Sequence, residues 1–161
     1  MSIYDPITLR ENCFLCPAPI KPDVNLRLFD GSVVSEQGKT GSQWRLHYSF
    51  QLPSLCCDHF ELTPVKGKGN GESLERYNIK KHDYIIADRN YATQSGIEYI
   101  ASKDAYSLVR VNTSTLPLFD RNSEKINLLD LFDQSLTESG KYGEWEVYTK
   151  TKSGELIQGR L

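Results

Sequence analysis

The sequence has no apolar run long enough to cross a bilayer and no excess of charge of one sign. Its 161 residues carry a net charge of −2, whereas a domain that binds DNA on its own usually shows a clear basic excess. The N-terminal residues have neither the basic start nor the apolar centre of a signal peptide. These absences predict a cytoplasmic protein with no membrane partner.

Cysteine is also scarce, with Cys13, Cys16, Cys56 and Cys57 as its four positions. Disulfides are rare in the cytosol. Cys13 and Cys16 have zinc-knuckle spacing, but a structural zinc needs four ligands, and adjacent Cys56 and Cys57 would point to opposite faces of a strand. The preferred interpretation is therefore four ordinary thiols, and a zinc at Cys13 and Cys16 is the alternative.

The sequence does contain a clear change of pattern along the chain. Residues 1–24 hold several prolines and are expected to be irregular. Three extended runs between residues 26 and 65, joined by short links, predict an antiparallel meander. Helical and extended segments then alternate. The predicted order is β-β-β-α-β-α-β, an α/β fold with a mixed sheet, its later elements at residues 71–81, 82–90, 93–105 and 106–112.

The last part of the chain, residues 113–161, has a different texture. It contains short extended pieces separated by turns, and residues 127–136 have room for one or two helical turns. The stretch from Glu144 to Leu161 predicts a β-hairpin that turns around Ser153 and Gly154. This segment is therefore expected to be a β-rich appendage to the alternating fold.

Two acidic residues lie where this fold could use them. Asp30 is in the middle of the first expected strand, and Asp88 is at the carboxyl end of the fourth. Ligands of open α/β sheets gather beyond the carboxyl ends of strands, and neighbouring strands are about 5 Å apart. Two carboxylates so close would repel unless one were protonated or a divalent cation lay between them. The alternative is that each acid only caps a helix or forms a turn.

Several segments taken together resemble a known family. They are "LRLFDGSVV", "WRLHYSF", "LTP", "GESLERY", "DYIIADRNYATQSGIEYI" and "LVRVNTSTLPLFD", in this order. The chain from about Leu26 onward resembles insertion-sequence transposases of the DDE type, which have a ribonuclease-H-like catalytic core. The resemblance implies a partial ribonuclease-H-like core at 25–112 and a β-rich insertion segment at 113–161, which follow the irregular N-terminal segment 1–24.

The resemblance also implies roles for individual residues. Asp30 and Asp88 correspond to the first and second catalytic acids, which bind Mg²⁺ or Mn²⁺, and the partner is DNA at transposon ends and target sites. Arg89 is similar to a residue that contacts DNA phosphate, although a local salt bridge is an equal alternative. His47 and Arg110 are further candidates for DNA contact, and for His47 a structural hydrogen bond is the preferred alternative.

The chain departs from the family pattern in one important respect. The family uses a third acid, a glutamate on a helix after the insertion, and Glu144, Glu146 and Glu155 lie in strand-like sequence instead. We therefore expect a catalytic-core fragment, truncated at both ends and inactive alone, of an enzyme that cleaves and transfers DNA strands. The alternative is a non-catalytic nucleic-acid or protein-binding domain that interferes with an intact transposase. Self-association or mixed assembly would fit either function.

Overall fold

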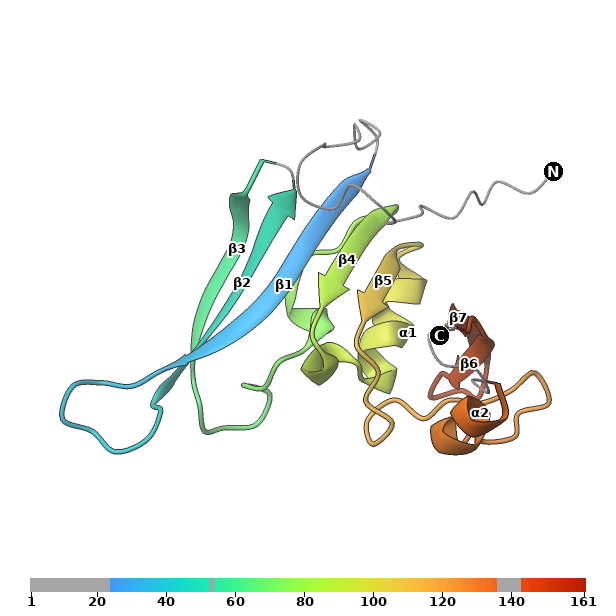
Figure 1. Cartoon of the computed structure of the whole chain (residues 1–161). Coiled ribbons are helices and arrows are strands. Elements are labelled where there is room, and N and C mark those ends of the chain that lie inside the picture. The colour runs from blue at the N-terminus through green and yellow to red at the C-terminus, as the bar shows by residue number, and fades with distance from the viewer. Residues whose placement is uncertain (1–23, 53, 136–142) are drawn as a thin grey trace.

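The computed structural model describes residues 24–52, 54–135 and 143–161. The segment 1–23, with the zinc candidates Cys13 and Cys16, lies outside the described residues. The described chain forms a five-stranded sheet in the order β3-β2-β1-β4-β5 and a separate two-stranded sheet (Figure 1). The strands of the larger sheet are β1 (Asn25–Val34), β2 (Trp44–Leu52), β3 (Cys56–Pro64), β4 (Asp83–Ala87) and β5 (Tyr106–Val109).

The five-stranded sheet combines antiparallel and parallel pairing. β2 pairs antiparallel with both β1 and β3, and β4 pairs parallel with both β1 and β5. The predicted meander and the predicted mixed sheet are therefore both confirmed. β1 is long enough to continue past the end of β4, and its last residues pair with β2 alone in a hairpin that extends away from the rest of the sheet (Figure 1).

The helix predicted between β3 and β4 is wrong in length, because only the 3-10 turn η1 (Leu74–Arg76) forms there. Ser73 caps this turn by accepting a hydrogen bond from the amide of Glu75 at 3.2 Å. Leu74 and Tyr77 are buried at a helical spacing, but the next buried residue is Ile79, two positions on, as in an extended chain. Burial of Ile79 therefore ends the helical turn.

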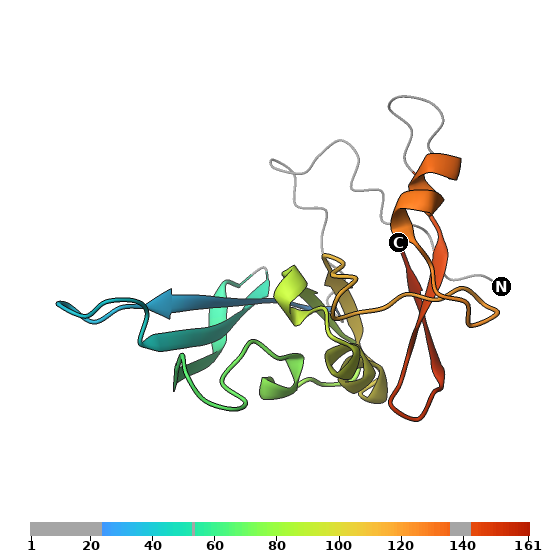
Figure 2. The same ribbon diagram turned by 90° about the horizontal axis from the view of Figure 1, so that it is seen from below.

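The helix predicted between β4 and β5 is confirmed as α1 (Gln94–Ser102), preceded by the 3-10 turn η2 (Arg89–Tyr91). Thr93 caps α1 by accepting a hydrogen bond from the Gly96 amide at 3.1 Å. α1 and η1 pack on the same side of the sheet (Figure 2). The main core lies between them and the sheet, and its buried members are Phe29, Leu74, Tyr77, Ile79, Ile85, Ala87, Tyr91 and Ile100.

The two faces of the five-stranded sheet differ, and we name them by what packs on them. The covered face lies against α1 and η1 and carries Arg27, Phe29, His47, Ser49, Thr63, Ile85 and Ala87, all buried. The open face carries the alternate residues of the same strands. Its side chains are mainly apolar, and large ones are exposed: Leu28, Phe60, Leu62, Tyr84, Tyr106 and Leu108.

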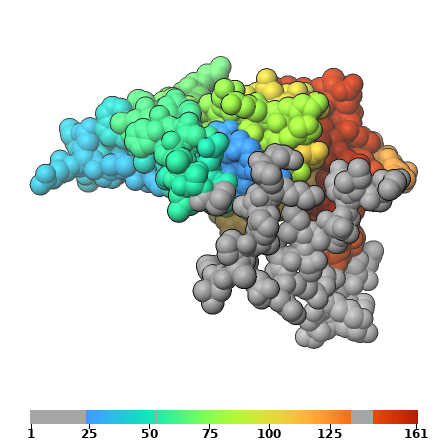
Figure 3. All heavy atoms as spheres, turned by 90° about the horizontal axis from the view of Figure 1, so that it is seen from above, coloured from blue at the N-terminus to red at the C-terminus, as the bar shows by residue number. Residues whose placement is uncertain are grey.

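The C-terminal segment packs beside α1 and β5. It contains α2 (Leu128–Ser135) and the predicted hairpin, confirmed as β6 (Glu146–Lys150) and β7 (Leu156–Arg160). The hairpin lies at the opposite end of the molecule from the extended β1–β2 hairpin (Figure 3). A second apolar cluster of Ala92, Leu116, Leu118 and Val147 joins it to the core. Within the described ranges, no helix is long and apolar enough to span a membrane.

Candidate functional site

The strand register places three charged residues in one row across the open face. Phe29 of β1 pairs with Ala87 of β4, and Ala87 pairs with Val109 of β5. The residues that follow these three are Asp30, Asp88 and Arg110. Since side chains alternate along strands, this next row points toward the open face, at the carboxyl ends of the parallel strands. The register therefore supports the expected approach of Asp30 and Asp88 and adds a cation to the row.

The carboxylate of Asp30 is half-buried and held by two neutral donors. One oxygen accepts a hydrogen bond from the backbone N–H of Gly31 at 2.8 Å, and the other accepts one from the hydroxyl of Tyr48 at 2.8 Å. The pKa of Tyr48 is raised: a hydrogen bond with Ser32 lowers it, but the bond to Asp30, burial and the charge of Asp30 outweigh that effect. Tyr48 therefore keeps its proton and fixes the direction of the Asp30 side chain.

The carboxylate of Asp88 has a cation as its partner. Its Oδ1 lies 2.8 Å from Nη2 of Arg110, and the two side chains are 46% and 67% exposed. Asp88 precedes η2 and occupies the capping position, yet its side chain makes no capping hydrogen bond. The alternative in which Asp88 is only a helix cap is thus not what the geometry shows, and its carboxylate faces a positive charge instead.

Two buried tyrosines, Tyr77 and Tyr91, lie on the covered side of the sheet close to the backbone of Asp30. The hydroxyls of Tyr77 and Tyr91 are 3.1 Å apart, and that of Tyr77 also lies 3.5 Å from the backbone oxygen of Asp30. Burial raises the pKa of Tyr77 to about 12, and burial together with the hydrogen bond to Tyr77 raises the pKa of Tyr91. Both rings therefore stay neutral. Tyr91 packs in the main core and anchors the turn after Asp88.

The residues of the row fit a hard divalent cation in chemistry and in charge. Both acids offer only oxygen ligands, which Mg²⁺ and Mn²⁺ prefer, and the guanidinium of Arg110 shows that Asp88 already attracts a cation. The fit is partial. Among the described residues, no group of three His, Cys, Asp or Glu side chains is placed to share a metal ion.

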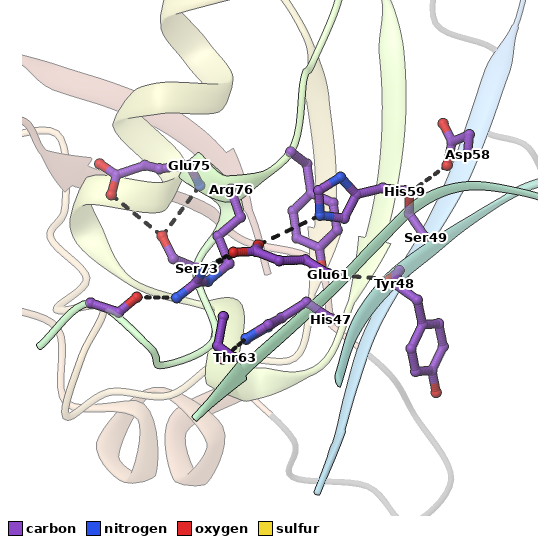
Figure 4. Close-up of polar contacts among 12 residues, drawn as sticks. His47, Tyr48, Ser49, Asp58, His59, Glu61, Thr63, Ser73, Glu75 and Arg76 are labelled. Atoms are coloured by element: carbon purple, nitrogen blue, oxygen red, sulfur yellow. Dashed lines mark hydrogen bonds and ion pairs between the residues drawn. The ribbon is translucent and has the colours of Figure 1, made fainter. Parts of the chain in front are cut away.

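The other residues with an expected DNA contact lie in different surroundings. Arg89 is exposed directly after Asp88, and no ion pair involves it in the described part of the chain. His47 is fully buried on the covered face, away from the acids, with Nε2 3.1 Å from Oγ1 of Thr63. Figure 4 shows the His47 and Tyr48 side chains on opposite sides of β2. For His47 the geometry supports the structural hydrogen bond.

The glutamates of the C-terminal segment pair locally. Glu146 lies 3.1 Å from Arg121, and Glu144 lies 2.7 Å from Arg160. The pKa of Glu146 is lowered, first by a hydrogen bond from the Tyr148 hydroxyl and then by Arg121. Neither glutamate lies in a helix. They therefore have the ordinary partners of surface carboxylates.

Two residues close to Asp30 and Gly31 were not expected from the sequence. Tyr48 sits opposite Asp30 in the β1–β2 register, and the carboxylate of Glu72 approaches Gly31 so closely that a Cβ there would lie 3.1 Å from Oε1 of Glu72. Glu72 also pairs with Arg45 at 3.3 Å, on the covered side. Alternation along "WRLHYSF" indicates which face Tyr48 shares, but its partner depends on a pairing register that local sequence does not define.

The cysteines that the structure describes are exposed free thiols. Cys56 and Cys57 begin β3, and the thiol of Cys57 donates to the backbone oxygen of His59 at 3.1 Å. Their partners within β2, Gln51 and Phe50, confirm that the two cysteines belong to a strand. Neither is part of a cluster that could hold a metal among the described residues.

Comparison with known proteins links the chain to insertion-sequence transposases. It is 29% identical over 141 residues to the transposase for insertion sequence element IS421 of Escherichia coli. A protein of Escherichia coli K12 named as the transposase InsL of insertion sequence element IS186A shows the same identity over the same length. Each match covers 84% of this chain and 37% of the relative. No family profile and no solved structure matches the chain.

Proposed function

We propose that this relative of insertion-sequence transposases contributes the first two acids of a DDE-type catalytic core with a ribonuclease-H-like sheet. The proposal is supported by the β1–β4 register: Asp30 of β1 and Asp88, which directly follows β4, each come one residue after the last parallel pair, Phe29 and Ala87. The names of its relatives support the same function. The chain spans 37% of the length of these relatives. The reaction of a full-length transposase is therefore also proposed.

In this proposal the chain's own residues prepare a site for a phosphodiester. Hydrogen bonds from the Gly31 amide and the Tyr48 hydroxyl orient the Asp30 carboxylate. Asp88 directly follows β4 and so lies at the carboxyl end of that strand. A bound Mg²⁺ or Mn²⁺ would activate a water or a 3′-hydroxyl and stabilise the leaving oxygen. Exposed Arg89 is placed to contact DNA phosphate beside the acids. The reaction class is DNA strand cleavage and strand transfer at transposon ends.

A direct test measures the affinity of the full chain for Mn²⁺. The electron paramagnetic resonance signal of the free ion reports how much Mn²⁺ remains unbound. We expect Asp30→Asn and Asp88→Asn each to weaken binding at least about tenfold, which corresponds to about 1.4 kcal/mol. Asp104→Asn is the matched control, because Asp104 is an exposed acid in a 3.0 Å pair with Lys81 and lies before β5, at the opposite end of that strand from Arg110. Affinity that survives both site substitutions would show that the acid pair is not a metal site.

Strand transfer itself is expected to be very weak in the isolated chain. Two carboxylates supply only part of a cation's ligands, and no third His, Cys, Asp or Glu joins them among the described residues. A gel assay with a labelled transposon end, a target duplex and Mg²⁺ measures this directly. Robust transfer by the 161-residue chain would contradict the expected need for a third acid.

A second candidate function is a binding domain without catalysis, favoured by the exposed apolar residues of the open face. Such a domain would interfere with an intact transposase by mixed assembly. It predicts that DNA affinity or association with a full-length relative persists in Asp30→Asn and Asp88→Asn. Fluorescence anisotropy with a duplex, and size-exclusion chromatography with the relative, separate this function from the catalytic one.

A further inference from the structure

Arg110 is the only cation that pairs with either acid of the row within the described ranges. It lies 2.8 Å from Asp88, while the partners of Asp30 are the neutral Gly31 amide and Tyr48 hydroxyl. Arg110 follows β5 directly and occupies the position next to Asp88 in the parallel register. The row therefore consists of two negative charges and one positive charge, and that positive charge belongs to the protein.

A divalent cation at the acid pair and the guanidinium of Arg110 would compete for the same carboxylate. Like charges a few ångströms apart repel, so both cannot pair closely with Asp88. The Arg110 side chain is 67% exposed and starts just beyond the end of a strand. It is therefore free to turn away, and its long stem lets the guanidinium reach a ligand that lies over the same edge of the sheet.

We infer that Arg110 is a regulatory residue that occupies Asp88 until a divalent cation displaces it, and that the displaced guanidinium then binds a DNA phosphate. This inference rests on the proposed function, because it assumes that Asp30 and Asp88 bind the cation. Guanidinium groups bind phosphates through two parallel hydrogen bonds. Metal and DNA then strengthen each other's binding, and the coupling is the same in both directions because binding free energies are linked.

The first experiment compares Mn²⁺ affinity, without DNA, in the wild-type chain and in Arg110→Gln. Removal of the competing cation is expected to tighten Mn²⁺ binding about two- to fivefold, the range that an exposed ion pair is worth. Arg160→Gln is the matched control, since Arg160 and Glu144 form a 2.7 Å pair with side chains 63% and 62% exposed. It should leave Mn²⁺ affinity unchanged. Because an unfolded variant would bind Mn²⁺ more weakly, a higher Mn²⁺ affinity in Arg110→Gln would indicate the loss of a competing cation.

The second experiment measures anisotropy of a labelled random-sequence duplex with and without Mn²⁺. In the wild-type chain Mn²⁺ should strengthen DNA binding more than it does in Arg110→Gln, and the substitution should weaken DNA binding only when Mn²⁺ is present. The salt dependence of binding in Mn²⁺ should fall by about one phosphate contact in Arg110→Gln. Arg160→Gln should keep the full effect of Mn²⁺.

The outcomes separate this inference from the function on which it rests. If Asp88→Asn leaves Mn²⁺ binding intact, the metal site is wrong and the inference fails with it. If Mn²⁺ binding depends on Asp88 while Arg110→Gln changes neither Mn²⁺ affinity nor its coupling to DNA, only the role of Arg110 is overturned. If the wild-type chain binds Mn²⁺ too weakly to measure and Arg110→Gln binds it measurably, the competition is supported in its strongest form.

Discussion

The two faces of the five-stranded sheet differ in an unexpected way. The covered face buries several polar side chains, and the open face exposes several large apolar ones. The covered face buries Arg27, His47 and Ser49 beside the apolar core, and these polar groups pair with one another or with neighbours. The open face is rich in leucine, phenylalanine and tyrosine, and Phe60 and Leu108 stand exposed on it. The candidate acids lie on the rim of this second face.

This difference shows that burial in a sheet depends on what packs over each face and less on which face is more apolar. α1 and η1 lie over the covered face, so its polar groups must find partners within the protein. An exposed apolar face of this extent is typical of an interaction surface. The two acids therefore lie where the buried layer of the sheet borders its exposed apolar face.

The sharpest test of the comparison uses the same residue type on both faces. Phe29 is 1% exposed on the covered face, and Phe60 is 68% exposed on the open face. Phe29→Ala is expected to lower the free energy of unfolding by about 3–5 kcal/mol, because it removes a buried ring and leaves a cavity. Phe60→Ala should change it by about 0.5 kcal/mol or less, since surface substitutions rarely do more.

Urea unfolding followed by circular dichroism measures both variants under one protocol. The slope of the free energy against urea shows whether the two variants unfold the same amount of surface. A loss in Phe60→Ala that approaches the loss in Phe29→Ala would mean that something covers the open face in solution. Comparison at two protein concentrations would then reveal whether a second copy does so.

A second test compares a buried ion pair with an exposed one. Arg27 is buried, with Nε 2.8 Å from Oδ2 of Asp58 and Nη1 3.3 Å from Oδ2 of Asp83, itself buried. Arg27→Met should cost about 3–5 kcal/mol, because it leaves buried negative charge without compensation. Arg110→Met breaks an exposed pair on the open side and should cost at most about 1 kcal/mol.

Thermal and urea unfolding at neutral pH provide the measurement. Asp83→Asn is a useful companion to Arg27→Met, since it removes the buried partner instead of the arginine. If the double variant Arg27→Met with Asp83→Asn recovers part of the loss of the single variants, the cost came from uncompensated charge. Equal losses in Arg27→Met and Arg110→Met would contradict the distinction between the faces.

The sequence was sufficient for the succession of strands along the chain and for the alternation of side chains between two faces, but not for the order of the strands in the sheet or for which face is covered. Alternation along "LRLFDG" places Leu28 and Asp30 on one face and Phe29 on the other, and the structure shows the same division. Apolar content alone would favour the wrong face as the core. The pairing of Arg110 with Asp88 depends on the β4–β5 register, which arises from tertiary packing.

The short length of η1 could not be predicted from local sequence for a similar reason. "GESLERYNIKK" has the composition of a short helix, and propensity is a weak guide where tertiary contacts compete. Arg76 donates to the backbone oxygens of Gly69 and Gly71 and pairs with Glu61 of β3 at 3.0 Å. These contacts hold the segment against the sheet in a form that a continuous helix could not adopt.

A smaller effect is expected at the two tyrosines that join the covered core to the acid row. Tyr77→Phe removes the 3.1 Å partner of the buried Tyr91 hydroxyl, whereas Tyr91→Phe leaves the Tyr77 hydroxyl its contacts with the backbone oxygens of Asp30 and Tyr48 at 3.5 and 3.4 Å. Tyr77→Phe should therefore cost about 1–3 kcal/mol, and Tyr91→Phe less. The double variant should cost less than the sum, because it leaves no buried hydroxyl unsatisfied. A double-mutant cycle in urea measures the coupling, and additive losses would show that the two hydroxyls act independently.

The smallest expected effect is a pH dependence that belongs to the covered face. Burial, with the charge of Arg76 next, holds the pKa of His47 below its ordinary value, and the nearby Glu61 opposes this while Arg45 and His59 add to it. The unfolded chain then binds a proton at His47 more readily than the folded chain. Stability from this group is therefore complete above about pH 6.5 and falls as the pH drops toward the lowered pKa.

The measurement is the melting temperature of the wild-type chain and His47→Gln between neutral and mildly acidic pH. Glutamine keeps a hydrogen-bonding group near Thr63 but cannot gain a charge, so the variant should lose less stability on acidification. One proton changes the free energy by at most about 1.4 kcal/mol per pH unit. Identical pH profiles would show that the acid sensitivity of the folded chain does not arise at His47.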